Sequence, residues 1–209
     1  MKDAITIMPT EDIAGCGPLL PGGRGAKIPL RQQVFQFVRG NGTAARTDIT
    51  RALDISAGSA TTITADLISA GVLREIATPG RENGRGRPPV ALQIVPDVAH
   101  VIGIKLSYEK HTAVLTDFAG NIVADVAIGT GLKRRSLPQF LDEITSLIAQ
   151  VLVAANMTIG QIKAIGIGLP GIIDHASGRI VWSALLQDRN EDLRGAFAKR
   201  FPMPLYLDN

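Results

Sequence analysis

The arginines between positions 31 and 90 are the residues whose chemistry is easiest to interpret. This stretch holds eight basic and five acidic side chains, and all eight basic ones are arginine. The stretches 1–30 and 91–209 each balance their charges, so the whole net charge of +3 lies in 31–90. A guanidinium pairs with phosphates and guanine edges through two hydrogen bonds. The distribution therefore favours a nucleic-acid partner, although an ordinary solvated basic face would have the same composition.

A short basic run, Arg85-Gly86-Arg87-Pro88, gives these arginines a specific place to act. Glycine and proline favour an extended path that is narrow enough for the minor groove of DNA, where A·T tracts attract inserted arginine. Such a run is also typical of a flexible linker. Its place directly after three predicted helices favours DNA contacts by Arg85, Gly86 and Arg87.

Small polar residues open the third of these predicted helices, Ser56-Ala57-Gly58-Ser59-Ala60-Thr61-Thr62. With Ala60, Ile63 and Leu67 turned inward, the outward residues would allow close approach to a major groove, with hydroxyl bonds to phosphates and methyl contacts to thymine. A plain three-helix bundle with a solvated Ser/Thr face has the same pattern. The candidate DNA contacts here are Arg46, at the start of the preceding helix, and Ser56, Ala57, Gly58, Ser59, Thr61 and Thr62.

The elements that must position these residues follow the order of a winged helix-turn-helix, over residues 29–95. Periodicity predicts helices from Pro29 to about Gly40, over 46–53, and over 57–70 with Ser56 as N-cap and Gly71 as C-cap. Strands are expected over 72–76 and 90–94, on either side of the polar loop 77–89. Residues 1–28 are rich in glycine and proline and are interpreted as a flexible leader.

Residues 100–209 predict a second domain of α/β order. Three β-rich runs come first, followed by an amphipathic helix over 137–154, a buried strand over 162–169, a helix over about 191–200 and a strand over 204–207. The first three runs are 101–107, 112–117 and 122–128.

Composition excludes several classes of protein. Cys16 is the single cysteine, so the chain has neither an internal disulfide nor a cysteine-rich metal site, and its three histidines are isolated. No window approaches the roughly 18 uninterrupted apolar residues of a membrane span, and the N-terminus lacks the order of a signal peptide. We expect a cytoplasmic protein without a membrane partner, a bound metal or a cofactor.

The stretch from about Leu30 to Asn209 resembles the ROK family (repressors, open reading frames and sugar kinases), and specifically its repressor branch. Three segments carry the resemblance: ARTDITRALDISAGSATTITADLISAGVL, GRGRPPVALQI and AIGIGLPGIIDHASGRI. The first is similar to the repressors' winged helix, the second to their wing and linker, and the third to the family's Gly-Ile-Gly-x-Pro-Gly strand and turn. The resemblance implies a sugar-responsive repressor, with the first lobe of an actin-like/ribonuclease H-like ROK domain behind the winged helix.

The resemblance also implies which site residues are present. Kinases of the family hold ATP phosphates on an Asp-x-Gly-Gly-Thr loop, and the matching acid and glycines are Lys105, Ser107 and Tyr108 here. Side chains at glycine positions block the close backbone approach that phosphates need, and Lys105 supplies no anion for magnesium. We therefore expect no kinase activity and no catalytic residues. The candidate sugar contacts are Gly171, Gln187, Asp188 and Asn209, the last matching the first residue of the family's Asn-Asp pair.

Three functions stay open at this point. The first is a repressor of carbohydrate-utilisation genes that a sugar or sugar derivative releases from double-stranded DNA, acting as a homo-oligomer. The second is a carbohydrate kinase with an N-terminal extension, and the third is a truncated DNA-binding remnant. Because the family's second lobe would lie beyond Asn209, we expect residues 1–209 alone to bind DNA without responding to sugars.

Overall fold

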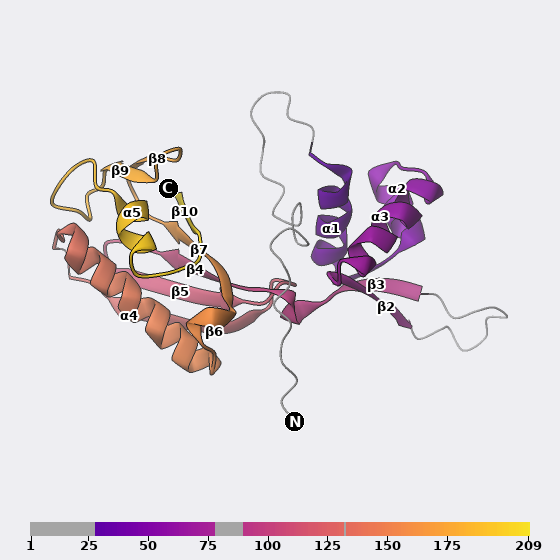
Figure 1. Ribbon diagram of the computed structural model, residues 1–209, viewed down its shortest axis with the longest axis horizontal. Helices are drawn as coiled ribbons and strands as arrows, with labels where there is room; N and C mark the ends of the chain where they lie inside the picture. The colour runs from indigo at the N-terminus through magenta and orange to yellow at the C-terminus, as the bar shows by residue number, and fades with distance from the viewer. Residues whose placement is uncertain (1–27, 78–89, 132) are drawn as a thin grey trace. The chain divides into compact units, whose positions relative to one another are not determined.

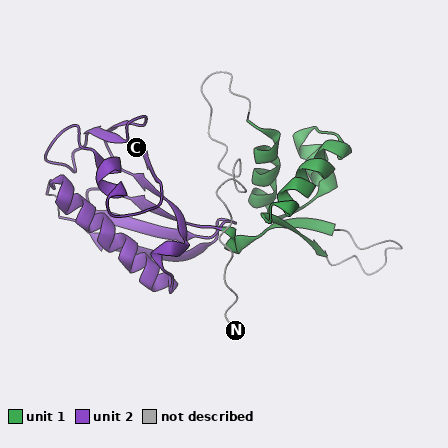
Figure 2. Ribbon diagram, in the orientation of Figure 1, with its two compact units in different colours: residues 1–98 green, residues 99–209 purple. Residues whose placement is uncertain are grey.

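The structure, a computed structural model, describes residues 28–77, 90–131 and 133–209 (Figure 1). The chain divides into two compact units, residues 1–98 and 99–209 (Figure 2). Each unit buries its own set of hydrophobic side chains. The leader predicted over 1–28 and the run Arg85-Gly86-Arg87 fall outside the described residues, except for Ile28.

Three helices and a small sheet make up the first unit. Val34, Phe35 and Val38 bury one side of the first helix, which ends where Gly42 takes a φ of 71°. The second helix has the predicted bounds, and a hydrogen bond from the Ala45 amide to Asp48 Oδ2 at 3.2 Å holds its first turn. The helices are α1 (Leu30–Asn41), α2 (Arg46–Leu53) and α3 (Ala57–Ser69).

The third helix begins where its capping residue predicts. Ser56 Oγ accepts the Ser59 amide at 3.0 Å, as an N-cap does. The helix ends at Ser69 with Ala70 as its cap, and Gly71 follows with a φ of 70°, so the predicted glycine cap lies one position too far along the chain. The buried stripe also differs from the prediction, because Thr64 is fully buried and Ile63 is only half-buried.

The sheet of the first unit has one strand more than the predicted hairpin. β2 (Leu73–Ala77) and β3 (Val90–Ile94) pair antiparallel, and β1 (Thr43–Ala45) pairs with the other side of β3. The strand order is therefore β1-β3-β2. β1 connects α1 directly to α2, so the start of α2 is fixed to this sheet.

A five-stranded mixed sheet forms the centre of the second unit, in the order β10-β7-β4-β5-β6. β4, β7 and β10 run parallel to one another, and the hairpin strands β5 and β6 are antiparallel to their neighbours. The strands are β4 (His100–Lys105), β5 (Lys110–Thr116), β6 (Ile122–Gly129), β7 (Ile162–Gly168) and β10 (Leu205–Asp208).

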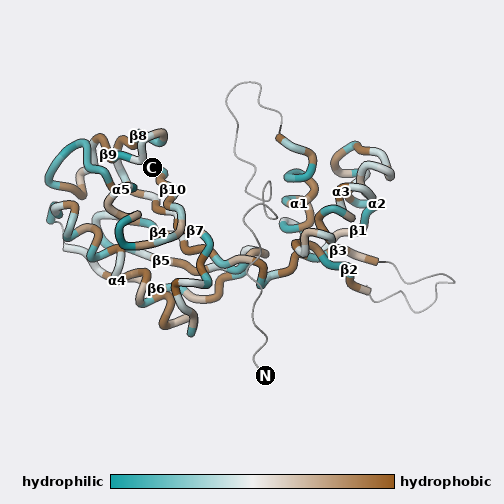
Figure 3. Tube along the Cα trace, in the orientation of Figure 1, coloured by the Kyte–Doolittle hydropathy of each residue, from teal (hydrophilic) through white to brown (hydrophobic). Residues whose placement is uncertain are grey.

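Two helices cover one face of this sheet and complete the core. α4 (Leu137–Ala155) buries seven residues, among them Phe140, Ile144 and Leu147. Hydrophobic and hydrophilic residues alternate along its trace (Figure 3). Among the described residues α4 is the one helix with the length and composition of a membrane span. Its apolar side packs into the core cluster of this unit, as that of a core helix does. The predicted helix over 191–200 is shorter, α5 (Leu193–Ala198).

A small hairpin between β7 and α5 was not predicted. β8 (Ile172–Asp174) pairs antiparallel with β9 (Arg179–Trp182) in a separate two-stranded sheet. Gly171 precedes it, and a Cβ at that position would lie 2.3 Å from the carbonyl oxygen of Trp182. The hairpin therefore folds back so closely on the end of β7 that only glycine fits there.

Candidate functional site

The start of α3 presents the small residues that the sequence singled out. Ser56, Ala57, Gly58 and Ser59 are all exposed, as are Thr61 and Thr62. Ser56 Oγ also lies 2.9 Å from Ser59 Oγ, and Thr61 donates to the carbonyl oxygen of Ala57 at 2.8 Å. These bonds hold the hydroxyl groups in place, while each oxygen keeps lone pairs for an outside partner. The exposed surface at the start of α3 therefore consists of short, mostly polar residues.

Gly58 is not required by the packing of α3. A Cβ added there would meet one atom within 4 Å, Ser56 Oγ at 3.7 Å, which is an ordinary contact. Glycine in a helix is less stable than alanine by about 0.5–1 kcal/mol. The absence of a side chain at this exposed position therefore favours close approach by something outside the chain.

Arg46 lies behind α3 and makes contacts within the first unit. Its Nε donates to Thr64 Oγ1 at 2.9 Å, and one terminal nitrogen lies 2.8 Å from Glu75 Oε1. The Arg46 side chain is 30% exposed. The sequence grouped Arg46 with the DNA contacts, and nothing in the periodicity indicated that it joins three elements.

The wing candidates can be placed only through the strands on either side of them. Arg85, Gly86 and Arg87 lie outside the described residues, between β2 and β3. On these strands the exposed Arg74 donates from Nε and a terminal nitrogen to Gln93 Oε1, at 3.0 and 2.7 Å. This cross-strand pair adds another guanidinium to the surface of the small sheet.

In the second unit, the segment that matches the kinases' phosphate loop is closed by internal bonds. Ser107 Oγ donates to the Lys110 carbonyl oxygen at 2.5 Å, and Thr130 Oγ1 donates to that of Tyr108 at 2.7 Å. The Ser107 amide donates to His111 Nδ1 at 3.2 Å. Lys105 and Tyr108 are exposed side chains where phosphate binding needs an acid and a glycine. The tip of this hairpin is therefore not shaped to hold a triphosphate.

A partly buried network that the sequence did not predict lies beneath the hairpin. His111 is buried, and its Nε2 lies 3.2 Å from Glu143 Oε2, while Arg135 Nε donates to Glu143 Oε1 at 2.8 Å. Burial lowers the pKa of His111, and the Glu143 carboxylate opposes this effect only in part. His111 lies 32 residues before Glu143, and the three residues meet only through β5, α4 and the loop before α4, so no local motif could have revealed them.

The predicted sugar contacts fall into two pairs. Asn209 Nδ2 donates to the Gly171 carbonyl oxygen at 3.1 Å, so these two residues lie together beyond the ends of β10 and β7. The backbone N–H of Gln187 donates to the Arg135 carbonyl oxygen at 2.9 Å, and Asp188 beside it is exposed. The latter pair therefore lies against the loop that leads into α4.

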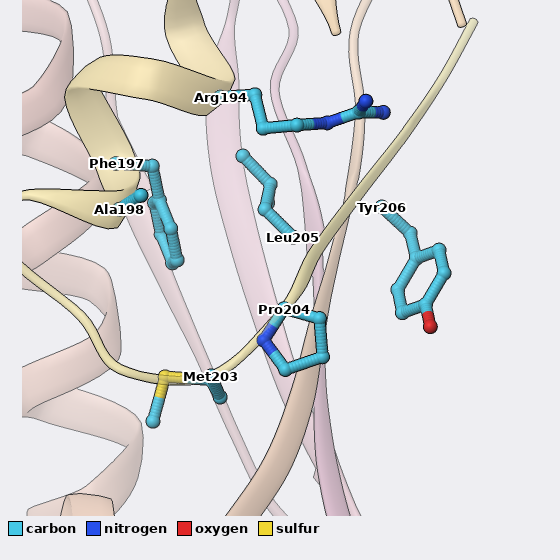
Figure 4. A pocket seen from close by; sticks show the side chains of 7 residues that line it. All are labelled: Arg194, Phe197, Ala198, Met203, Pro204, Leu205 and Tyr206. Carbon is cyan, nitrogen blue, oxygen red and sulfur yellow. The ribbon is translucent and has the colours of Figure 1, made fainter. Parts of the chain in front are cut away.

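Two cavities lie near these pairs. A cavity of about 150 Å³ lies between the β4–β5 hairpin and the loops around Arg135 and Leu185, and Lys133 and Arg134 also line it. A second, of about 370 Å³, lies between α5 and β10, with Arg194, Phe197 and Tyr206 on its walls (Figure 4). None of the predicted sugar contacts lines either cavity. Over the described ranges, no three His, Cys, Asp or Glu side chains gather as metal ligands do.

Comparison with known proteins gives consistent similarities. Residues 101–209 match the sequence profile of the ROK family. The xylose repressor of Caldicellulosiruptor bescii is 32% identical over 180 residues, which cover 84% of this chain and 43% of that protein. The DNA-binding transcriptional repressor Mlc of Escherichia coli is 27% identical over 177 residues, with 84% and 43% covered. The dual regulator NagC of E. coli is 25% identical over 198 residues, with 90% and 47% covered.

A solved structure shares the fold. The crystal structure of a ROK family transcriptional regulator, a homologue of the E. coli Mlc protein, superposes with a TM-score of 0.59 at 24% identity. The superposition covers 85% of this chain and 44% of the chain of that regulator. The chain thus spans a little under half the length of the relatives that it matches.

Proposed function

The chain belongs to the ROK family, and from that premise we propose that it is a DNA-binding transcription regulator of carbohydrate-utilisation genes. In this proposal residues 29–95 form a winged helix-turn-helix, and α3 enters the major groove with its small-residue end first. The exposed hydroxyl and glycine positions at the start of α3 carry the proposal, since the packing of α3 leaves room for a larger residue at Gly58. Matched relatives named as repressors support it.

The proposed contacts are of two kinds. Ser56, Ser59, Thr61 and Thr62 would bond to phosphates or base edges, and Ala57 and Gly58 would let the helix approach closely. Arg85 and Arg87, with Gly86 between them, would enter the adjacent minor groove. Double-stranded DNA is then the main partner, and the bacterial cytoplasm is where the protein would meet it.

A sugar or sugar derivative is the proposed effector, and the second unit would supply the first lobe of its receptor. Gly171 and Asn209 would supply one side of the site, and Gln187 and Asp188 another. A homo-oligomer would place two reading helices on successive half-sites of a two-fold operator. The proposal includes no catalysis, because the hairpin at Lys105–Lys110 lacks the acid and the glycines that phosphoryl transfer needs.

In vitro selection tests this function. The purified 209-residue chain is incubated with a random duplex library, and bound duplexes are amplified and sequenced over several rounds. We expect enrichment of one sequence motif, with A·T-rich steps where Arg85 and Arg87 would lie. If the bound pool stayed as random as the input after repeated rounds, the protein would not be a sequence-reading regulator.

A further inference from the structure

Arg46 is the one described side chain that the structure shows bonded to both α3 and the wing strand β2. It begins α2, donates from Nε to Thr64 Oγ1 on α3, and forms an ion pair with Glu75 on β2. The distances are 2.9 and 2.8 Å. A guanidinium can hold two partners in fixed directions because its five N–H groups form a rigid fork.

The contact on α3 continues into the backbone of the reading helix. The Thr64 hydroxyl, which accepts the bond from Arg46, donates to the carbonyl oxygen of Ala60 at 2.8 Å. Ala60 lies between Ser59 and Thr61, two of the proposed DNA contacts. Thr64 is fully buried, where an apolar residue would normally pack. The Thr64 hydroxyl supplies Arg46 with an acceptor on α3, and its own proton is satisfied by the helix backbone.

The contact on β2 reaches the base of the wing. Glu75 lies opposite Leu92 in the β2–β3 ladder, two residues before β2 ends at Ala77. The Glu75 side chain is 48% exposed, so this ion pair adds little stability by itself. Its use is directional, because it connects β2 to the start of α2.

We infer that Arg46 is a positioning residue that sets the angle between α3 and the wing strand, so that both meet one duplex in a single geometry. The inference rests on the proposed function. A residue of this kind determines how well the operator is distinguished from other DNA, while the number of phosphates that the protein contacts stays the same.

Four variants separate positioning from contact. Thr64→Val removes the hydroxyl at constant shape, whereas Thr64→Ser keeps it. Glu75→Gln removes the ion pair, and Arg46→Lys keeps the positive charge without the guanidinium fork. Ile49→Val is the matched control, because it trims the core of the same unit and removes no hydrogen bond or ion pair of this network. Binding is measured by fluorescence anisotropy on a duplex selected by the unmodified chain and on a scrambled version, across a salt series.

We expect Thr64→Val and Arg46→Lys to reduce the ratio of the affinity for the selected duplex to the affinity for the scrambled duplex. The reduction should be roughly tenfold, as the loss of a hydrogen bond to a charged group would give. Glu75→Gln should cause a smaller loss, and Thr64→Ser should restore the ratio. The slope of log affinity against log salt should stay as in the unmodified chain, because no phosphate contact is lost. Ile49→Val should leave the ratio unchanged.

Other results would overturn the inference. If Arg46→Lys lowered affinity equally on both duplexes, or if a further variant, Arg46→Ala, lowered the salt slope by about one unit, Arg46 would be a phosphate contact. If Thr64→Val acted only in proportion to its loss of melting temperature, as Ile49→Val does, the network would be structural. Equal binding of both duplexes by the unmodified chain would instead refute the proposed function, and this inference with it.

Discussion

At the scale of single residues, Gly58 links the sequence to the proposed function most directly. It lies in the first turn of α3, is exposed, and has room for a methyl group. Gly58→Ala should therefore raise the free energy of unfolding by about 0.5 kcal/mol, because alanine is the better helix former. The same change should weaken binding to a selected duplex several-fold, because the methyl group separates the helix from the groove.

Gly40→Ala is the matched control for this prediction. Gly40 also lies on a helix, α1, with nothing within 4 Å of an added Cβ. Gly40→Ala should raise the free energy of unfolding by a similar amount and leave DNA binding unchanged. Thermal melts measure stability and anisotropy titrations measure DNA binding. Tighter or equal DNA binding by Gly58→Ala would show that Gly58 is not part of the interface.

His111 gives a second prediction at this scale, in the pH dependence of stability. Burial lowers its pKa in the folded chain below the ordinary 6.5, so the unfolded chain binds the proton more readily. The contribution of His111 to stability is therefore complete above about pH 6.5 and is lost as the pH falls toward the folded pKa. The limiting slope is about 1.4 kcal/mol per pH unit.

His111→Gln tests this effect, since glutamine keeps a hydrogen-bonding side chain but does not titrate. Urea unfolding of the second unit between pH 7.5 and 5 should show a fall in stability for the unmodified chain that exceeds the fall for the variant. Identical pH profiles of the two proteins would mean that His111 does not titrate differently on folding.

At the scale of elements, the wing makes the most quantitative prediction. Replacing Arg85 and Arg87 by alanine should weaken DNA binding most on A·T-rich sites. The slope of log affinity against log salt should fall by about one unit for each lost phosphate or groove contact. Arg189 and Lys199, exposed in the second unit, provide a control double variant with the same loss of charge. If both double variants bound DNA alike, net charge would explain the affinity and the wing assignment would be wrong.

The elements differ in how far the sequence could predict them. α2 has its predicted bounds, and α3 begins where Ser56 caps it, because helix ends are set by local chemistry. β1 was missed because a three-residue strand has no period of its own and exists only through its pairing with β3. The β8–β9 hairpin likewise depends on the close approach of Gly171 to Trp182, which is a tertiary contact.

The candidate sites divide in the same way. The exposed small residues of α3 follow from periodicity, whereas the bond between Asn209 and Gly171 joins residues 38 positions apart and has no local signal. Periodicity predicted that Ile63 belongs to the buried stripe, but the structure buries Thr64 instead. A hydropathy pattern contains no information on the hydrogen bond from Arg46 to the Thr64 hydroxyl. The network of His111, Arg135 and Glu143 has no local signal at all.

At the scale of the whole molecule, the distribution of charge and chemistry separates the two units. The net charge of +3 lies in 31–90, within the first unit, and the second unit carries the hairpin that cannot hold a triphosphate. We therefore expect no heat of binding when magnesium-ATP is titrated into the chain, and no sugar phosphorylation. Micromolar binding of magnesium-ATP in this calorimetric titration would contradict the absence of an enzymatic function.

The central claim is that this chain reads a DNA sequence, and a binding titration tests it most directly. The 209-residue protein is titrated by fluorescence anisotropy against its selected duplex and a scrambled duplex of the same composition, at several salt concentrations. The account predicts affinity for the selected duplex at least about a thousandfold tighter at near-physiological salt, with both affinities falling as salt rises. Equal affinities for the two duplexes, or no binding to either, would contradict it.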